Sequence, residues 1–103
     1  MFGLYPKSYE TILKIIEDCV TIDQVVIYGS RAKGTCKEGS DVDITLFGDV
    51  SNEDLFKLRN DLDDSDVPYL FDISIHSKLS SESLKEHIAR VGKVFYKREI
   101  LKS

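Results

Sequence analysis

The sequence is most informative at first through what it lacks. Its 103 residues include only two cysteines, too few for a disulfide framework, so we expect free thiols in a cytoplasmic protein. No apolar run approaches the roughly 20 residues that would cross a bilayer, and residues 1–7 have neither the basic start nor the apolar stretch of a signal peptide. A membrane role is therefore not expected.

An excess of basic charge is also missing. The chain carries 18 acidic and 14 basic residues, a net charge of −4, whereas general nucleic-acid binders usually show the opposite balance or a dense basic patch. Nucleic acid is therefore an unlikely partner. No internal repeat, low-complexity tract or linker interrupts the 103 residues, which are enough for one core and too few for two. We expect one domain, residues 1–103.

Hydrophobic periodicity predicts alternating helices and strands. Helices are expected from about Pro6 through Val20, after a cap at Ser51 with Asp54 as its capping-box partner, and from Ser81 to Val91 with Gly92 as the stop. Strands are expected at residues 25–28, 41–47, 69–76 and 94–96. These elements predict an α+β fold in which a mixed sheet carries its helices mainly on one face. The polar sides of two strands would form a site on the other face.

The first chemical signal is the turn that follows the first strand. Gly29 and Ser30 end that strand, and Arg31 and Lys33 add positive charge nearby. Glycine lets a backbone approach a bulky anion, and a short helix capped by Ser30 would direct free N–H groups at a phosphate. Taken alone, a Gly-Ser turn after a strand is more often only a turn.

A pair of aspartates strengthens the signal. Asp41 and Asp43 are two apart on an expected strand, so their side chains share a face with Cα atoms roughly 6.6 Å apart. Two like charges there are unfavourable without a counter-charge, which Mg²⁺ would supply. Asp72 interrupts a later apolar strand on its polar face and is the candidate third ligand of a two-metal site. Solvated strand aspartates are the simpler alternative for each residue taken singly.

Together these residues resemble a known family. Gly29-Ser30, ten intervening residues, Asp41-x-Asp43 and a later strand aspartate are similar to the pattern of the minimal nucleotidyltransferase (MNT) family of the DNA polymerase beta superfamily. The resemblance implies a polymerase-beta-like palm. It also implies that Gly29 and Ser30 hold a nucleoside triphosphate, with Arg31 and Lys33 near its phosphates.

The same resemblance implies metals and a reaction. Asp41 and Asp43 would ligate two Mg²⁺ ions, and Asp72 would ligate one of them and help activate the attacking hydroxyl. Family members are often paired with a helical HEPN protein, so the chain is expected to form a hetero-oligomer. It would act as the antitoxin of a type VII-like pair by transferring AMP from ATP to a tyrosine of the toxin.

Two other functions stay open. The same fold could neutralise a HEPN partner by contact alone, or it could transfer a nucleotide to a small molecule or an RNA end. Among the other residues, Tyr28 is expected either to stack near a base or to pack in the core. His87 is expected to be solvated, and Cys36 to be a free loop thiol.

Overall fold

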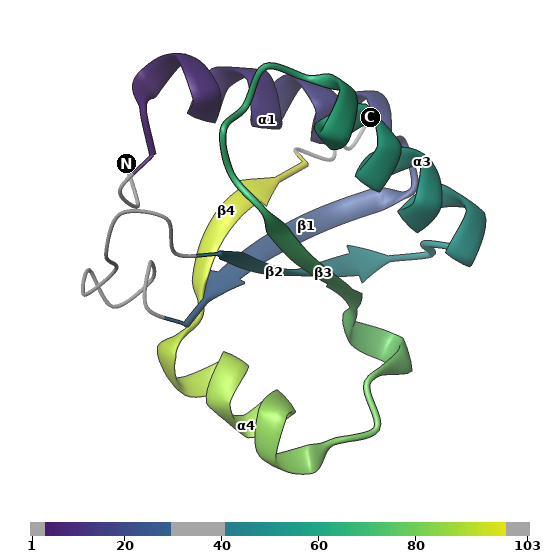
Figure 1. Ribbon diagram of the computed structural model, residues 1–103. Coiled ribbons are helices and arrows are strands. Elements are labelled where there is room, and N and C mark those ends of the chain that lie inside the picture. Colours follow the sequence, from purple (N-terminus) through teal and green to yellow (C-terminus); the bar gives the residue numbers. More distant parts are fainter. Residues whose placement is uncertain (1–3, 30–40, 99–103) are drawn as a thin grey trace, which may run out of the picture.

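The computed structural model describes residues 4–29 and 41–98. Three α-helices, four strands and one short 3-10 helix lie in these two ranges (Figure 1). In chain order they are α1 (Pro6–Asp18), β1 (Ile22–Tyr28), β2 (Val42–Gly48), α3 (Asn52–Asp64), β3 (Phe71–Ile75), η1 (His76–Lys78), α4 (Glu82–Val91) and β4 (Lys93–Lys97). None of the described helices is long and apolar enough to cross a membrane.

The strands form one mixed sheet in the order β3-β2-β1-β4. β1 pairs antiparallel with both β2 and β4, whereas β2 and β3 are parallel. A parallel pair needs a crossover between its strands, and α3 supplies it. The predicted mixed sheet of an α+β fold is confirmed.

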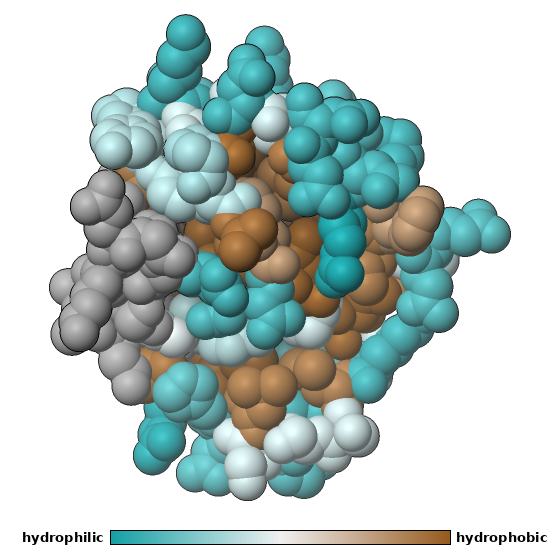
Figure 2. All heavy atoms as spheres, in the orientation of Figure 1, coloured by the Kyte–Doolittle hydropathy of each residue, from teal (hydrophilic) through white to brown (hydrophobic). Residues whose placement is uncertain are grey.

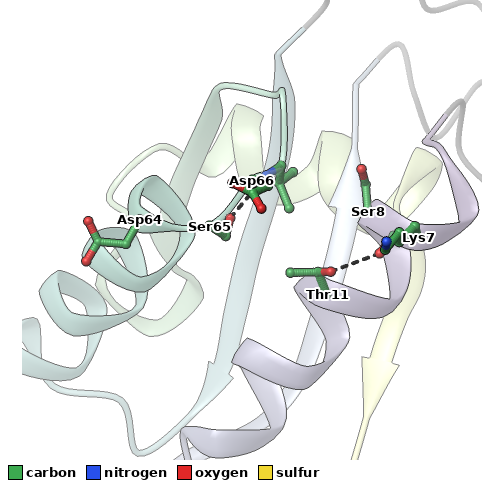
Figure 3. Close-up of a pocket in the computed structure, with 7 residues that line it drawn as sticks. Lys7, Ser8, Thr11, Asp64, Ser65 and Asp66 are labelled. Carbon is green, nitrogen blue, oxygen red and sulfur yellow. Dashed lines mark hydrogen bonds between the residues drawn. The ribbon is translucent and has the colours of Figure 1, made fainter.

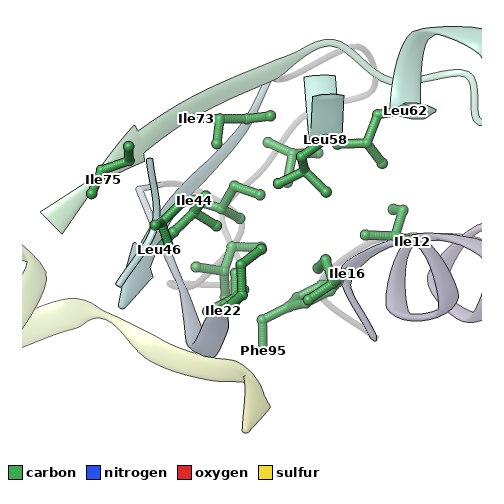
Figure 4. Close-up of a cluster of buried hydrophobic side chains, with 14 of the residues drawn as sticks. Ile12, Ile16, Ile22, Ile44, Leu46, Leu58, Leu62, Ile73, Ile75 and Phe95 are labelled. Atoms are coloured by element: carbon green, nitrogen blue, oxygen red, sulfur yellow. The ribbon is translucent and has the colours of Figure 1, made fainter. Parts of the chain in front are cut away.

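Helices cover both faces of this sheet, with α1 and α3 on one side and α4 on the other (Figure 1). The larger core lies between the sheet and the helices α1 and α3 (Figure 4). It joins Ile12 and Ile16 of α1 and Leu58 and Leu62 of α3 to alternate residues of the strands, among them Ile27, Ile44 and Ile73. A smaller cluster on the opposite face joins Val26 and Tyr28 of β1 to Ile88 of α4. α4 therefore covers part of the face that the sequence predicted to be simply polar.

Local signals explain where the helices begin. Pro6 occupies the first turn of α1, where its missing N–H costs nothing. At the start of α3, Ser51 accepts a hydrogen bond from the Asp54 backbone N–H at 3.1 Å, and the Asp54 carboxylate accepts one from the Ser51 backbone N–H at 3.1 Å. The predicted capping box is therefore confirmed. Thr21 also donates to Asp54 at 2.9 Å, which links this cap to the residue before β1.

Several element boundaries differ from the sequence prediction. α1 ends at Asp18 because Cys19 already has an extended backbone, so Val20 lies outside the helix and is 75% exposed. β1 begins at Ile22 rather than at residue 25, and β2 begins at Val42 rather than at Asp41. β3 is shorter than predicted because the chain turns into η1 at His76, whose ring stacks on Phe47.

Gly92 ends α4 as predicted, but for a different reason. Its backbone is extended, with φ −67° and ψ 148°, so the left-handed conformation that usually favours glycine after a helix is not used. A Cβ at this position would collide with the Ile88 carbonyl oxygen and would lie 2.6 Å from Cγ1 of Val26. Glycine is required here because α4 turns closely over β1.

We expect Gly92→Ala to destabilise the chain by about 1–3 kcal/mol, as overpacking of a filled site usually does. Chemical denaturation measures the change in the free energy of unfolding. Ala89→Ser is the matched control because Ala89 is exposed on the same helix. Equal unfolding free energies for the wild type and Gly92→Ala would show that α4 can move off β1 freely.

Candidate active site

The candidate site is a row of three side chains that crosses the sheet. Tyr28 of β1 is the register partner of Asp43 of β2, and Asp43 is the partner of Asp72 of β3. Neighbouring strands lie about 4.8 Å apart, and residues in register present their side chains to the same face. Tyr28 packs with α4, so this row lies on the face opposite the α1 and α3 helices. We call Asp43 and Asp72 the acidic pair.

Asp41 lies close to this row but outside the strand. It is exposed and precedes the first residue of β2, so the expectation that Asp41 and Asp43 both stand on one strand is wrong. Its charge still reaches the row, because it contributes to the raised pKa of Asp43. The partner that stands directly beside Asp43 is Asp72, from a strand far along the chain.

The electrostatics of the row centre on Asp43. Burial raises the pKa of the Asp43 carboxyl above its ordinary value, and the charges of Asp72 and Asp41 raise it further. The two ion pairs found within the described ranges join Lys57 to Asp61 and Lys85 to Glu82, so neither neutralises this group. The row is therefore a site where a cation would relieve repulsion.

Gly29 makes room for the acidic pair. Its φ is +80°, a conformation that other residues rarely adopt, and a Cβ there would lie 2.5 Å from Oδ2 of Asp43. The glycine that the sequence assigned to phosphate binding is thus also needed for the position of a carboxylate. The other predicted phosphate-binding residues, Ser30, Arg31 and Lys33, lie outside the described residues, as do the short helix expected there and Cys36.

A second row of hydroxyl groups lies one step along the strands. Thr45 of β2 is the register partner of Ser74 of β3, and the Ser74 hydroxyl donates to Oγ1 of Thr45 at 3.0 Å. Sequence reasoning did not single out these two residues, although both follow the candidate aspartates by two positions on the same face. That spacing was the available signal.

Tyr28 and His87 connect the row to α4. Tyr28 is 8% exposed and belongs to the core cluster on this face, so of its two expected roles the structure supports core packing. The His87 ring meets the Tyr28 ring edge to face, with 6.4 Å between centroids. His87, which was expected to be solvated, is half-buried, because α4 turns this residue toward the sheet.

The donor set suits a divalent cation, although it is not complete by itself. Carboxylate oxygens from adjacent strands, next to a glycine turn, are the ligands that Mg²⁺ takes together with phosphate oxygens. Across residues 4–29 and 41–98, no three Asp, Glu, His or Cys side chains form a ready-made metal site. Metal binding by Asp41, Asp43 and Asp72 stays a prediction.

A surface pocket lies elsewhere on the molecule (Figure 3). It is between the first turn of α1 and the residues that end and follow α3, and Lys7, Asp64 and Asp66 are among its lining residues. Hydrogen bonds within each wall hold it, one from Thr11 to the Lys7 carbonyl and one from the Val67 N–H to Ser65. None of the predicted site residues lines this pocket, which is on the α1–α3 side of the sheet.

The family model described as "Polymerase beta, Nucleotidyltransferase" matches residues 10–100. The chain therefore belongs to the polymerase beta nucleotidyltransferase family. No curated protein is significantly similar to it.

Solved structures share the fold at low identity. A chain in a crystal structure of a toxin–antitoxin complex with AMP-PNP is 23% identical, with a TM-score of 0.67 over 88% of this chain and 74% of that one. A chain of the toxin–antitoxin complex MntA-HepT is 18% identical, with a TM-score of 0.66 over 91% of this chain and 74% of that one. A third structure holds a tri-AMPylated Shewanella oneidensis HEPN toxin in complex with an MNT antitoxin; its matching chain is 19% identical, with a TM-score of 0.61 over 89% and 71%.

The raised pKa of Asp43 predicts a pH-dependent stability. A carboxyl whose folded pKa lies above its unfolded value lowers stability as pH rises from the ordinary value of 3.8 through the folded pKa. Above this pH window Asp43 is ionised in the folded state, so its burial and its repulsion from Asp72 and Asp41 lower the free energy of unfolding by their full amount. In EDTA we therefore expect Asp43→Asn to be more stable than the wild type at pH 7 and equally stable near pH 3.

Thermal unfolding across this pH range measures the difference. Asp49→Asn removes the same charge from an exposed position outside the row, and its difference from the wild type should change little over the same window. If the melting temperatures of Asp43→Asn and the wild type differ by the same amount at every pH, burial and neighbouring charges do not destabilise the ionised Asp43.

Proposed function

We propose that this chain is a Mg²⁺-dependent nucleotidyltransferase that transfers AMP from ATP to a hydroxyl group of a HEPN-type partner, and that it acts as the antitoxin of that partner. The hydroxyl oxygen would form a bond to the α-phosphorus as the bond to the β-phosphate breaks, and the hydroxyl proton and pyrophosphate would be released. The observation that carries the proposal is the register of Asp43 with Asp72 beside Gly29. The family match supports the reaction class, and the toxin–antitoxin structures with the same fold favour a HEPN-type partner and ATP.

Each residue would have a separate task. Asp41, Asp43 and Asp72 would hold two Mg²⁺ ions, which would neutralise charge on the triphosphate and draw electrons from the reacting phosphate. Gly29 and Ser30 would bind the triphosphate through the turn backbone, with Arg31 and Lys33 adding positive charge. Asp72 is exposed on an edge strand, so an incoming hydroxyl group can reach it and be oriented there.

The partner would supply the acceptor. Asp72 is exposed on the edge strand, so orientation of the hydroxyl group would come mainly from the partner's docking. Such orientation can contribute about 7–11 kcal/mol to a reaction barrier. The transfer rate should therefore depend strongly on the bound partner.

We expect ATP to bind much more weakly in EDTA than in Mg²⁺, because the carboxylates repel a triphosphate until cations neutralise them. Calorimetry with AMP-PNP, which is not consumed, measures both affinities. Asp49→Asn should behave like the wild type in both buffers. Equal affinities for wild-type protein with and without Mg²⁺ would contradict a site bridged by metal ions.

We expect Asp72→Asn to retain nucleotide binding better than it retains transfer, because Asp72 meets the acceptor. Both quantities are measured on one preparation with the HEPN-type partner and labelled ATP. A variant that loses binding but keeps its rate per bound nucleotide would refute this role. Wild-type protein that binds the partner but transfers nothing would favour neutralisation by contact alone.

A further inference from the structure

Thr45 is buried in an unusual way for a polar residue. It is 0% exposed, the one fully buried polar side chain within the described part of the chain, and it lies between apolar neighbours on β2. Valine has almost the same shape and would fill this place without a polar group. A buried hydroxyl is costly unless it is hydrogen-bonded, so the contacts of Thr45 require an explanation.

Those contacts run across three strands. The Ser74 hydroxyl donates a hydrogen bond to Oγ1 of Thr45 at 3.0 Å. The Thr45 hydroxyl in turn donates to the Ser74 carbonyl oxygen at 3.5 Å. The Ser74 side chain also interacts with the Tyr28 hydroxyl, since it lowers the pKa of that phenol against the larger effect of burial, which raises it. We call Tyr28, Thr45 and Ser74 the hydroxyl network. It links β1, β2 and β3 directly beneath the acidic pair.

The position of β3 at the edge of the sheet explains why this link matters. β3 is five residues long and forms one edge of the sheet, and within residues 4–29 and 41–98 its one neighbouring strand is β2. The negative charges of Asp43 and Asp72 repel each other across that single pairing. Ser74 follows Asp72 by two residues on the same face, so a bond at Ser74 acts next to the point where repulsion would move the edge strand away.

Tyr28 is itself held in place from the other side. Its ring packs against Ile88 and meets the His87 ring of α4, with 6.4 Å between the centroids of the two rings. The network therefore extends from an edge strand to a helix that covers the same face. Figure 2 shows hydrophilic side chains on this side of the molecule between two apolar zones, one beneath α3 and one between the sheet and α4.

We propose that the hydroxyl network positions Asp72 beside Asp43, so that Tyr28, Thr45 and Ser74 are positioning residues of the active site. This inference rests on the proposed function for its effect on metal binding and transfer. None of these three residues is assigned as a ligand of the metal or of the nucleotide. Its loss should leave the fold intact and misplace one carboxylate.

A matched pair of variants at one position separates this role from packing. Thr45→Val keeps the shape and removes the hydroxyl, whereas Thr45→Ser keeps the hydroxyl and removes a methyl group. The first readout is the Mg²⁺ concentration that gives half of the cation-induced rise in melting temperature, measured without nucleotide or partner. We expect this concentration to rise about 10-fold in Thr45→Val, comparable to the loss of an outer group that orients a metal ligand, and less than 2-fold in Thr45→Ser.

Tyr28→Phe should shift the Mg²⁺ midpoint in the same direction as Thr45→Val, because it also removes one hydroxyl and keeps the ring against α4. In the presence of the partner, both variants should lower transfer per bound nucleotide more than they weaken AMP-PNP binding. In an Asp72→Asn background, Tyr28→Phe should have little further effect on transfer, since the residue it positions has lost its charge. Additive losses would mean that Tyr28 acts on something else.

The opposite ranking at Thr45 would overturn the inference. If Thr45→Ser weakens Mg²⁺ binding as much as Thr45→Val or more, the residue matters for packing and the network does not position Asp72. A wild-type chain with no response to Mg²⁺ would instead refute the metal site of the proposed function.

A double-mutant cycle in the absence of metal tests the network independently of Mg²⁺ binding. In EDTA at pH 7, the stabilisation produced by Asp43→Asn should be smaller in a Thr45→Val background than in a Thr45→Ser background, because a released edge strand lets the carboxylates separate. Equal stabilisation in both backgrounds would show that the network does not hold Asp72 beside Asp43.

Discussion

The parallel pairing of β2 with β3 is the constraint on which the site depends. It places Asp43 and Asp72 in register, although 28 residues and a whole helix separate them in the sequence. Two carboxylates held this way repel each other, and burial of Asp43 adds to the cost. Natural chains retain such local conflicts mainly where function requires them. The pairing therefore explains the electrostatic cost of the site and why we expect it to attract cations.

The rest of the fold supports this pairing from several sides. α3 crosses over between the two strands, and its start is held by a reciprocal cap that Thr21 reinforces. Gly29 lets the end of β1 approach Asp43 without a collision. Ile73 and Ile75 on the other face of β3 are buried in the larger core, so hydrophobic contacts keep the edge strand in the sheet. Hydrophobic burial thus holds in place what the charges would separate.

Much of this arrangement could be predicted from local patterns. The alternation around Asp43 and Asp72, the stripe of Leu58 and Leu62 and the Ser51–Asp54 cap all lie within short stretches, and the structure has them as expected. Family resemblance added the meaning of the Gly-Ser turn and the aspartates. The roles of Ser30, Arg31 and Lys33 remain predictions.

Tertiary contacts decided what the patterns could not. The position of α4 over β1 turned His87 toward Tyr28, because the sheet face that a helix covers depends on packing between distant parts of the chain. Val20 continued the helical period of α1 beyond the point where the chain turns toward β1. The bond between Ser74 and Thr45 depends on the strand register, which only the fold sets.

The central claim is that the acidic pair holds a divalent cation for nucleotidyl transfer. Anomalous diffraction from crystals of the chain with Mn²⁺ and AMP-PNP tests it most directly, since the signal identifies the metal by element and position. The account predicts anomalous density between the carboxylates of Asp43 and Asp72, next to the phosphates of the nucleotide. Nucleotide bound at the Gly29 turn with no manganese at the acidic pair would contradict it.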